Sequence, residues 1–491
     1  MRRQAIVSAT TLLIAAALAD DDASAASLQE AAALLSATSA KTLEFSGAGH
    51  WWQFGQAPVP GGAWPKFDVT SYTATINFDT NAERVQFARI QVLDGRPRPT
   101  PTEQKADWYV SGDKAWNLAP PPGAAPDAAP VAIPAFLQRD ERDADILSTP
   151  QGFLKAALAN NAESKPASDG VEVYFSIGKN RYVGVIGADN HVSLIKTWVD
   201  TPVLGDTPIE TSFSGYKDFG GLHFPSEISR SEGGFPVLHI NVASAKLNGP
   251  VEIAVPADIA GLTANPVTVA SEKIGDGVYY LTGGTHHSVA VEEKDHVVLV
   301  EAPLSEDRSV ALIQKIAEII PGKPVKYVIN SHVHFDHSGG LRTFVDAGAT
   351  IVTQDISRAY YEKAWAQPRT LRPDRLALSK KAAKFETYDD KYALGDSERP
   401  IEIHHIAGSG HSDDLALVYL PKEKLIVEAD AYTPAAPGAP APQSPNPFSV
   451  NLYETIEKLG LNVERIAGLH GRVATIDELR AAIGQKRASV N

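Results

Sequence analysis

Residues 331–337 read Ser331-His332-Val333-His334-Phe335-Asp336-His337 and place three imidazoles and a carboxylate within six positions. Such side chains are costly to desolvate, so a dense cluster of them indicates chemistry more than packing. Neutral imidazole and carboxylate are suitable ligands for zinc. The chain contains no Cys, which excludes thiolate metal sites, disulfides and a cysteine nucleophile. Any metal must therefore be held by His, Asp and Glu.

The elements around this stretch predict an α/β sheet. Val297–Val300 is a continuous apolar strand, and Asp307–Ile320 carries apolar residues at helical spacing. Val325–Ile329 is a second, mostly apolar strand, so the order strand, helix, strand indicates a βαβ unit with parallel strands. Ligand sites in such sheets lie beyond the carboxyl ends of strands, which is where the His-rich stretch falls. Further strands are expected near Ile351, Ile401, Leu415 and Leu425.

The hexapeptide His332–His337 resembles the H-x-H-x-D-H motif of the metallo-β-lactamase superfamily. Three later segments follow in the family's order: Gly410–Asp414 with a histidine, Leu425–Asp430 ending in an aspartate, and Gly468–Gly471 with the last histidine. The resemblance covers about residues 265–491. It implies an αββα sandwich and a metal-dependent hydrolase.

The resemblance also implies a ligand set for two zinc ions per chain. One ion would take His332, His334 and His411, and the other would take Asp336, His337 and His470. Asp430 would bridge the two ions. Two such cations share a hydroxide that serves as the nucleophile. Asp336 is expected to be catalytic as well, because it would orient that hydroxide and shuttle its proton.

Several other polar residues are ambiguous. Where family members often have an Asp-Thr-Gly-like turn, this chain has Glu301-Ala302-Pro303, and Glu301 either orients a metal ligand or caps a turn. His286 and His287 lie in a hairpin, which favours a structural or solvated role. His404 and His405 alternate along a strand and are not assigned.

The N-terminal half predicts a β-rich antiparallel domain. From about Leu28 to Pro256, short segments alternate polar and apolar residues, and one helix is expected at Pro150–Asn160. The predicted strands include Thr70–Phe78, Val171–Phe175, Arg181–Ile186, Val192–Val199 and Val237–Val242. Gly215–Pro225 resembles segments of periplasmic lipoprotein-carrier half-barrels, although a generic hairpin explains it equally well.

The first residues predict a secretory signal peptide. Arg2 and Arg3 precede the apolar run Ala5–Ala19, and Ala23-Ser24-Ala25 provides a cleavage site. The expected domains are then the signal peptide at 1–25, the β-rich domain at 26–262 and the catalytic domain at 263–491, in a periplasmic or secreted protein. No later segment has 18 consecutive apolar residues, so no membrane span is expected.

The net charge of the chain limits the classes of molecule that it is expected to bind. The chain has 45 Lys+Arg and 59 Asp+Glu, for a net charge of −14. Nucleic acids and anionic membranes select basic surfaces, so neither is expected as a partner. A small-molecule substrate is the remaining expectation, and the sequence leaves the oligomeric state open.

The bond that is cleaved has several candidates. An ester, a lactone or a related acyl bond is the preferred substrate, and β-lactams, sulfate esters and phosphodiesters are the alternatives on the same site. A second alternative is a non-catalytic protein whose β domain binds an apolar ligand while the metal domain serves as a scaffold. An iron oxidoreductase is disfavoured, because iron-type members typically have a carboxylate at the position of His334.

The segment Tyr432–Tyr453 is predicted to form a lip over the metals. Its six prolines at 434, 437, 440, 442, 445 and 447 are expected to exclude helix and sheet interior. Tyr432, Phe448 and Tyr453 would supply apolar area for an uncharged organic group. The alternative is that the segment packs against the N-terminal domain.

Overall fold

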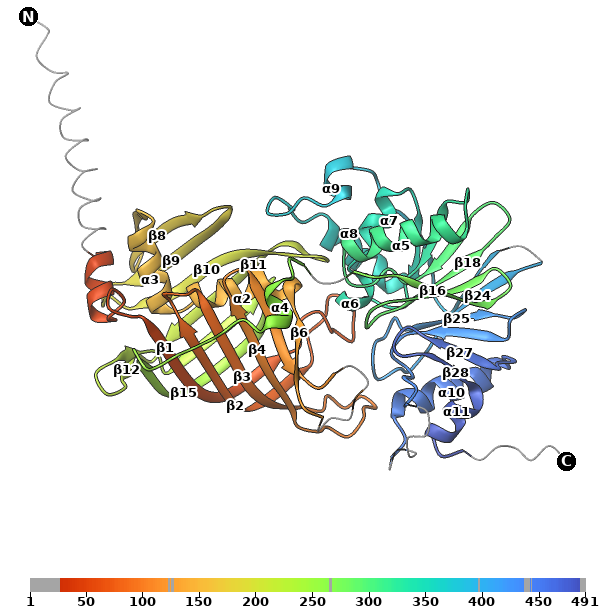
Figure 1. The fold of residues 1–491 in the computed structure, drawn as a ribbon, viewed down its shortest axis with the longest axis horizontal. Coiled ribbons are helices and arrows are strands. Elements are labelled where there is room, and N and C mark those ends of the chain that lie inside the picture. Colours follow the sequence, from red (N-terminus) through yellow and green to blue (C-terminus); the bar gives the residue numbers. More distant parts are fainter. Residues whose placement is uncertain are drawn as a thin grey trace, which may run out of the picture.

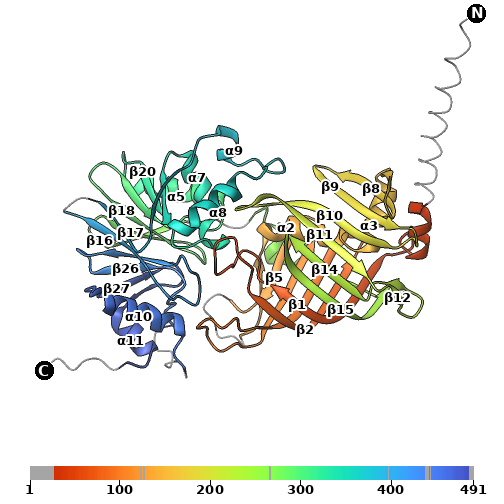
Figure 2. The same ribbon diagram turned by 180° about the vertical axis from the view of Figure 1, so that it is seen from behind.

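The computed structural model describes residues 27–485 except 122–123, 125–127, 265–266, 396–397, 437–441 and 443. The predicted signal peptide, residues 1–25, therefore lies outside the described residues. Figures 1 and 2 show a curved N-terminal sheet beside a layered C-terminal half. In the described part of the chain, no helix is long and apolar enough to cross a membrane.

One 13-stranded sheet forms most of the N-terminal half, in the order β6-β5-β4-β3-β2-β1-β15-β14-β11-β10-β9-β8-β7. The paired strands run antiparallel, from β1 against β2 to β7 against β8. The prediction of a β-rich antiparallel domain is confirmed. The strands are β1 (Thr42–Trp52), β2 (Lys66–Asn77), β3 (Ala82–Gln91), β4 (Gln104–Ser111), β5 (Lys114–Ala119), β6 (Val131–Pro134), β7 (Glu163–Ala167), β8 (Gly170–Ile177), β9 (Asn180–Gly187), β10 (Val192–Thr201), β11 (Gly205–Ser214), β14 (Glu227–Glu232) and β15 (Phe235–Leu247).

The sheet curls around two helices. Helix α2 (Arg139–Leu147) contacts β3, β4 and β5, and it also contacts β10, far along the strand order. A flat sheet could not bring β4 and β10 to one helix, so the sheet must curve. Helix α3 (Pro150–Ala159) matches the predicted helix, and the Thr149 side chain caps it. The smaller elements are η1 (Phe136–Gln138), β12 (Lys217–Asp218), β13 (His223–Phe224) and α4 (Ala257–Ala260).

Two sheets form the C-terminal half. The 7-stranded sheet has the order β16-β17-β18-β19-β20-β21-β22, and the 6-stranded sheet has the order β23-β24-β25-β26-β27-β28. The first contains β16 (Ala270–Gly275), β17 (Val278–Thr282), β18 (Ser288–Glu292), β19 (Val297–Val300), β20 (Val325–Ile329), β21 (Thr350–Gln354) and β22 (Lys384–Tyr388). The second contains β23 (Lys391–Gly395), β24 (Pro400–His405), β25 (Ala416–Leu420), β26 (Leu425–Glu428), β27 (Arg465–Gly468) and β28 (Val473–Thr475).

The helices of this half cover the outer faces of the two sheets, as Figure 1 shows. Those beside the first sheet are α5 (Glu306–Ile319), α7 (Leu341–Asp346), α8 (Asp355–Trp365) and α9 (Arg375–Ser379), whereas the short α6 (Phe335–Ser338) lies at the edge that faces the N-terminal half. Those beside the second are α10 (Pro447–Leu459) and α11 (Ile476–Ala482). The layers are helix, sheet, sheet and helix, which confirms the predicted αββα sandwich.

Strand β19 shows why the apolar pattern produces this architecture. Val298 and Val300 face the core between the two sheets, whereas Val297 and Leu299 face the core under α5. A strand that is buried on both faces must be apolar at every position. Strands β19, β20 and β21 are parallel, and the predicted βαβ unit is confirmed, with helix α5 shifted by one residue from the predicted range.

Candidate metal centre

The predicted ligand residues lie in loops at the ends of strands from both sheets. The loop after β20 carries His332 and His334, and α6 begins directly after His334. Across the sandwich, Asp430 and His470 each follow one of the two parallel strands β26 and β27. His411 lies in the loop that leads into β25. The two sheets therefore present their polar loops to one volume.

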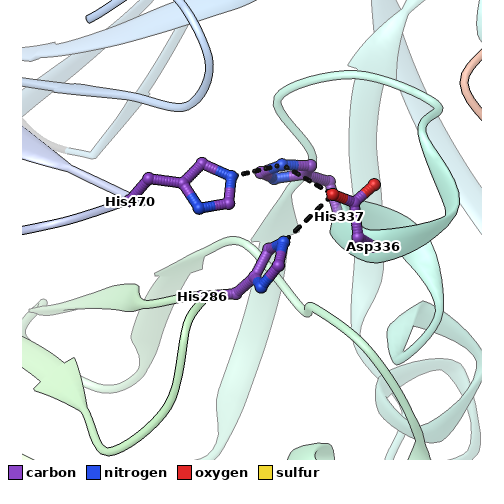
Figure 3. Close-up of side chains that lie close together, drawn as sticks. All are labelled: His286, Asp336, His337 and His470. Carbon is purple, nitrogen blue, oxygen red and sulfur yellow. Dashed lines mark hydrogen bonds and ion pairs between the residues drawn. The ribbon is translucent and has the colours of Figure 1, made fainter. Parts of the chain in front are cut away.

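The structure gathers these residues into two groups, and in each group every member has one donor atom within 4.8 Å of the others. The first group comprises His332, His334, His411 and Asp430, and the second, drawn in Figure 3, comprises His286, Asp336, His337 and His470. All seven residues predicted as ligands fall into one group or the other. His286 is the only addition among the described residues.

The Asp430 carboxylate lies between the two groups. Its Oδ2 is 2.8 Å from His411 Nε2 and 3.2 Å from Nε2 of both His332 and His337. Its Oδ1 is 2.8 Å from His470 Nε2. Burial raises the pKa of this carboxyl, but the imidazoles of His337 and His411 outweigh that effect and hold the pKa well below its usual range.

The histidines turn their lone pairs toward one another. His337 Nδ1 lies 3.2 Å from a Glu301 oxygen, and His470 Nδ1 lies 3.1 Å from the Thr285 carbonyl. Both Nδ1 atoms must donate, since carboxylate and carbonyl oxygens only accept. In the neutral imidazoles the two Nε2 atoms then carry lone pairs, although they are 3.1 Å apart. Two facing lone pairs repel each other unless a proton or a metal cation lies between them. Burial would lower the pKa of His337, but the contacts with Asp430 and Glu301 raise it well above its usual value, so without a metal this imidazole holds a proton.

The first group repeats this arrangement. The Ser331 hydroxyl donates to Glu301, so it accepts from Nδ1 of His332 at 2.9 Å. His332 Nε2 then faces His411 Nε2 at 3.2 Å. His332 and His411 each direct Nε2 to the centre. The other nitrogen of His332 is held by the Ser331 hydroxyl, as is usual for metal-binding histidines.

His334 uses its other nitrogen. Its Nε2 lies 3.1 Å from the carbonyl oxygen of Ala57 and donates to it. Its Nδ1 is buried and has no hydrogen-bond partner among the described residues. Burial and the neighbouring histidines lower the pKa of His334 well below its usual value, so the ring is neutral and Nδ1 carries a lone pair. Buried polar atoms are rarely left unpaired, and a metal ion satisfies this one.

Glu301 orients two parts of the centre. It is fully buried, and its carboxylate contacts His337, accepts from the Ser331 hydroxyl and accepts from the Asn330 amide. Its backbone has φ 76°, a left-handed conformation that is strained for a residue other than glycine. The orienting role is therefore the one the structure supports, and a simple turn cap would not require the burial of a carboxylate.

Two side chains hold the Asp336 carboxylate. Gln56 Nε2 donates to Oδ1 at 2.7 Å, and His286 Nε2 lies 3.0 Å from Oδ2 (Figure 3). Burial raises the pKa of Asp336, and the contacts with His286 and His337 outweigh it, so that the pKa lies well below its usual range. The sequence favoured a structural or solvated role for His286, whereas the structure places it against a predicted ligand.

The other ambiguous histidines support the scaffold. His287 Nε2 donates to the Gly471 carbonyl at 2.9 Å, which holds the loop that carries His470. Burial lowers the pKa of His287 to about 4. His404 lies 2.9 Å from Glu402 within its own strand, and His405 lies 2.8 Å from the Asp413 carbonyl. None of the three belongs to either ligand group of the described residues.

A buried carboxyl shapes the turn around Asp430. Glu428 ends β26 and accepts hydrogen bonds of 3.0 Å from the backbone N–H groups of Ala431 and Tyr432. Burial raises the pKa of Glu428 well above its usual value. The two bonds close the chain around Asp430 and direct its carboxylate toward the histidines.

The three aromatic residues predicted to bind substrate are separated by the fold. Tyr432 and Tyr453 are 5% and 9% exposed and belong to the core of the C-terminal half. Phe448 is half-buried, and its ring centroid lies 5.5 Å from that of His411. Of the three, only Phe448 lies against a predicted ligand.

The expectation that prolines exclude helix from this segment is wrong for its second part. Helix α10 begins at Pro447, the sixth proline, and extends to Leu459. Proline is well accommodated in the first turn, where the missing N–H has no intrahelical partner anyway, and the Asn446 side chain caps the helix. Prolines 437 and 440 lie outside the described residues.

The N-terminal half reaches the centre through the connection between β1 and β2. Gly55 accepts from the Phe335 N–H at 3.1 Å, and Pro58 accepts from the Asp413 N–H at 2.8 Å. A second connection contributes Arg96, which forms a two-pronged ion pair with Asp413 at 2.6 and 3.1 Å. No sequence motif signals these contacts, because the partners are hundreds of residues apart.

Nitrogen and oxygen donors of this kind, with lone pairs converging on Asp430, fit one or more divalent cations such as zinc. The structure therefore supports a metal-binding centre on grounds that are independent of the sequence motif.

Comparison with known proteins identifies the C-terminal half. The sequence profile of the metallo-β-lactamase superfamily matches residues 281–467. A metallo-β-lactamase type 2 of Elizabethkingia meningoseptica is 26% identical over 167 residues, which are 32% of this chain and 60% of that protein. The aligned part thus covers less than two thirds of that relative.

Solved structures are similar at lower identity. A metallo-β-lactamase from Pontibacter korlensis has a TM-score of 0.34 and 17% identity, covering 44% of this chain and 98% of that one. The DIM-1 metallo-β-lactamase has a TM-score of 0.33 and 17% identity, covering 45% of this chain and 96% of that one. The profile match and the relative agree with the fold and the ligand groups. The C-terminal half of this chain is a domain of the metallo-β-lactamase superfamily.

Proposed function

We propose that the protein is an exported dinuclear zinc hydrolase that cleaves an ester, a lactone or a related acyl bond. The observation that carries the proposal is the convergence of imidazole nitrogens on the Asp430 carboxylate, together with the buried and unpartnered Nδ1 of His334, and it supports cations between these groups. Export rests on the N-terminal segment with Arg2 and Arg3, and the acyl substrate rests on the metal-centre chemistry of the class.

The two ligand groups would hold one ion each. His332 and His411 would bind through Nε2 and His334 through Nδ1, while His337 and His470 would bind the second ion through Nε2. When bound, the two ions would supply Lewis acidity and lower the pKa of a coordinated water toward 7. Asp430 would neutralise part of the positive charge from its position between the groups.

Asp336 is the residue proposed to handle the proton. Gln56 occupies its Oδ1 and His286 faces its Oδ2, so the carboxylate is fixed at both oxygens. A carboxylate fixed in this way, with a pKa well below its usual range, would orient the attacking oxygen and would take up its proton only as bond formation makes that oxygen acidic, passing the proton on to the leaving group. The chain then needs no nucleophilic Ser or Cys.

Other bond classes remain alternatives on the same centre. β-Lactam cleavage has one specific argument in its favour, namely that the aligned relative is described as a metallo-β-lactamase. Sulfate esters and phosphodiesters also suit a dinuclear centre. The non-catalytic alternative, an apolar-ligand-binding protein with a scaffold metal domain, predicts bound metal without turnover.

The test combines metal content with turnover. Purified protein, stripped with a chelator and reloaded with zinc, should contain two ions per chain by elemental analysis. It should hydrolyse members of an ester and lactone panel faster than cephalosporins, sulfate esters and phosphodiesters. Fewer than one ion per chain in metal-replete protein would contradict the centre, and two ions without any turnover would favour the scaffold alternative.

A further inference from the structure

A cavity of about 430 Å³ lies in the N-terminal half between helix α2 and the curved sheet. Its size is within the range of small-molecule sites. Trp51, Trp52 and Trp108 line it. The ring centroids of Trp51 and Trp108 are 5.3 Å apart in an edge-to-face arrangement. Large flat side chains of this kind provide contact area for a ring-containing ligand at a small entropic cost.

Several charged groups of the cavity already have partners. Arg230 contacts Glu232 at 2.8 Å and Glu141 at 3.7 Å, and it also pairs with Asp145. Arg142 donates its guanidinium hydrogens to backbone carbonyls and to an Asn side chain. A charged ligand would meet groups of both signs and would have to compete with these pairs. The cavity therefore favours an uncharged ligand.

Three polar atoms of the lining have no hydrogen-bond partner among the described residues, namely Glu83 Oε2, Arg230 Nε and Arg230 Nη2, although Nη2 lies in an ion pair with Glu232. Glu83 lines the cavity and is 4% exposed, and its Oε2 has no hydrogen-bond partner among the described residues. Buried carboxyl oxygens are normally paired. A polar group of a ligand would satisfy this oxygen, as a donor to the carbonyl oxygen of the carboxyl or as an acceptor from its O–H group.

The cavity and the metal centre share one continuous segment. Residues 51–54 line the cavity, and residues 55–58 contact the loops that carry the predicted ligands. Phe54 joins the two, because it lines the cavity and packs edge-to-face on Phe335 with ring centroids 5.1 Å apart. Phe335 lies between His334 and Asp336 in the sequence.

We propose that this cavity binds the uncharged, ring-containing part of the substrate, while its acyl bond lies at the metal centre. The claim that the ligand is part of an acyl substrate rests on the proposed function. Ligand binding in the cavity can be measured without any turnover. The N-terminal half would then select the substrate and the C-terminal half would cleave it.

N-phenyl-1-naphthylamine is a suitable probe, because it is uncharged, contains fused rings and carries one N–H donor. Titration of the zinc-loaded full chain, followed by probe fluorescence, should show saturable binding at one site. The anionic analogue 8-anilinonaphthalene-1-sulfonate has the same rings with a sulfonate and should bind at least tenfold more weakly. His332→Ala should leave probe binding unchanged. No saturable binding, or equal affinity for the two probes, would overturn the inference.

Substitutions in the cavity lining test whether the probe binds there. Trp108→Ala, and Leu238→Trp as a cavity-filling change, should each weaken probe binding at least tenfold. Trp198→Ala is the matched control, since Trp198 is a half-buried tryptophan of β10 that does not line the cavity. Circular dichroism checks that each variant is folded. Unchanged binding in a folded Leu238→Trp protein would place the probe elsewhere and overturn the assignment.

Kinetics separate this inference from the proposed function. Trp108→Ala should raise KM for 1-naphthyl acetate several-fold, with KM for methyl acetate and kcat for both unchanged. An equal rise for both esters would contradict the substrate role of the cavity. If the zinc-loaded wild type cleaves no acyl substrate, the proposed function fails and the link to the substrate fails with it, whereas the probe titration still decides whether the cavity binds a ligand.

Discussion

Gln56 Nε2 donates a 2.7 Å hydrogen bond to Oδ1 of Asp336 across 280 positions of sequence. The N-terminal half thus contacts the residue that is proposed to handle the proton. Together with the Ala57 carbonyl on His334, this contact means that both ligand groups are supported from outside the C-terminal half. The metal centre is therefore a product of both halves of the chain.

Gln56→Ala should lower kcat about 10–100-fold, the usual effect of losing a partner that orients a metal ligand. Oδ1 of Asp336 would lose its partner, while Oδ2 would keep the contacts with His286 and His337, so the carboxylate would be free to adopt several orientations. Steady-state kinetics and a competition assay with a zinc chelator measure the two effects. Gln86→Ala, at an exposed position of β3, is the control and should match wild type. Wild-type kcat and zinc affinity in Gln56→Ala would show that the bond is incidental.

His332→Ala and Asp336→Asn should lower hydrolysis by orders of magnitude, because the nucleophile depends on bound metal. The N-terminal sheet shares no core cluster with these residues, so its signal in circular dichroism should persist. Elemental analysis should show lost metal in His332→Ala. Near-wild-type turnover in either variant would place the active site elsewhere.

His286→Ala should weaken zinc binding about 10–100-fold and leave the thermal midpoint close to wild type. His286 faces Asp336 Oδ2 and its ring centroid is 4.3 Å from that of His470, so its loss removes support from the second ligand group. His404→Ala is the matched control, because His404 is a buried histidine outside both groups. Equal zinc affinity in the two variants would restore the structural role that the sequence favoured for His286.

Buried carboxyls of the N-terminal sheet should make stability fall as pH rises. Burial raises the pKa of Glu83 to about 8, although Arg230 and Arg142 oppose the shift. Glu83 therefore keeps its proton in the folded state, whereas in the unfolded state it releases that proton above the ordinary glutamate pKa of 4.5. The stabilisation is fully present below that value and is lost as pH rises toward about 8.

The measurement is the thermal midpoint between pH 5 and pH 8. Glu83→Gln should flatten the decline, because an amide does not titrate. Part of the slope should remain, because burial also raises the pKa of Glu232 to about 8. Glu163→Gln, at an exposed position, should leave the slope unchanged. A slope in Glu83→Gln equal to that of wild type would refute the assignment.

The local sequence patterns predicted the ligand loops well, because the positions of these loops depend on residues that are close in sequence. Val325–Ile329 is mostly apolar, its last two residues are buried, and the polar stretch after it falls at the carboxyl end of a parallel strand. The position of that loop follows from the strand alone. The αββα layers follow from the same periodicities in the strands and helices of this half.

The contacts that complete the centre were not predictable in this way. Gln56 carries no motif, and its approach to Asp336 depends on the curvature of the N-terminal sheet and on how the two halves pack. The strand order of the N-terminal sheet also depends on long-range contacts, since β1 pairs with β15 about 200 positions away. A histidine such as His286 has many roles in a hairpin, and only the tertiary fold selects one of them.

The segment after Asp430 gives the last prediction, because the structure divides its aromatic residues between two roles. Phe448 packs against His411, whereas Tyr453 is buried in the core. Tyr453→Ala should cost about 3 kcal/mol of unfolding free energy through the cavity it leaves, with KM unchanged in protein that remains folded. Phe448→Ala should change KM and substrate preference, with both zinc ions retained and little loss of stability. Chemical denaturation, elemental analysis and kinetics on an ester panel distinguish the two. If Phe448→Ala alters stability but leaves the ester preference unchanged, the start of α10 is part of the scaffold and the substrate lies on another side of the metals.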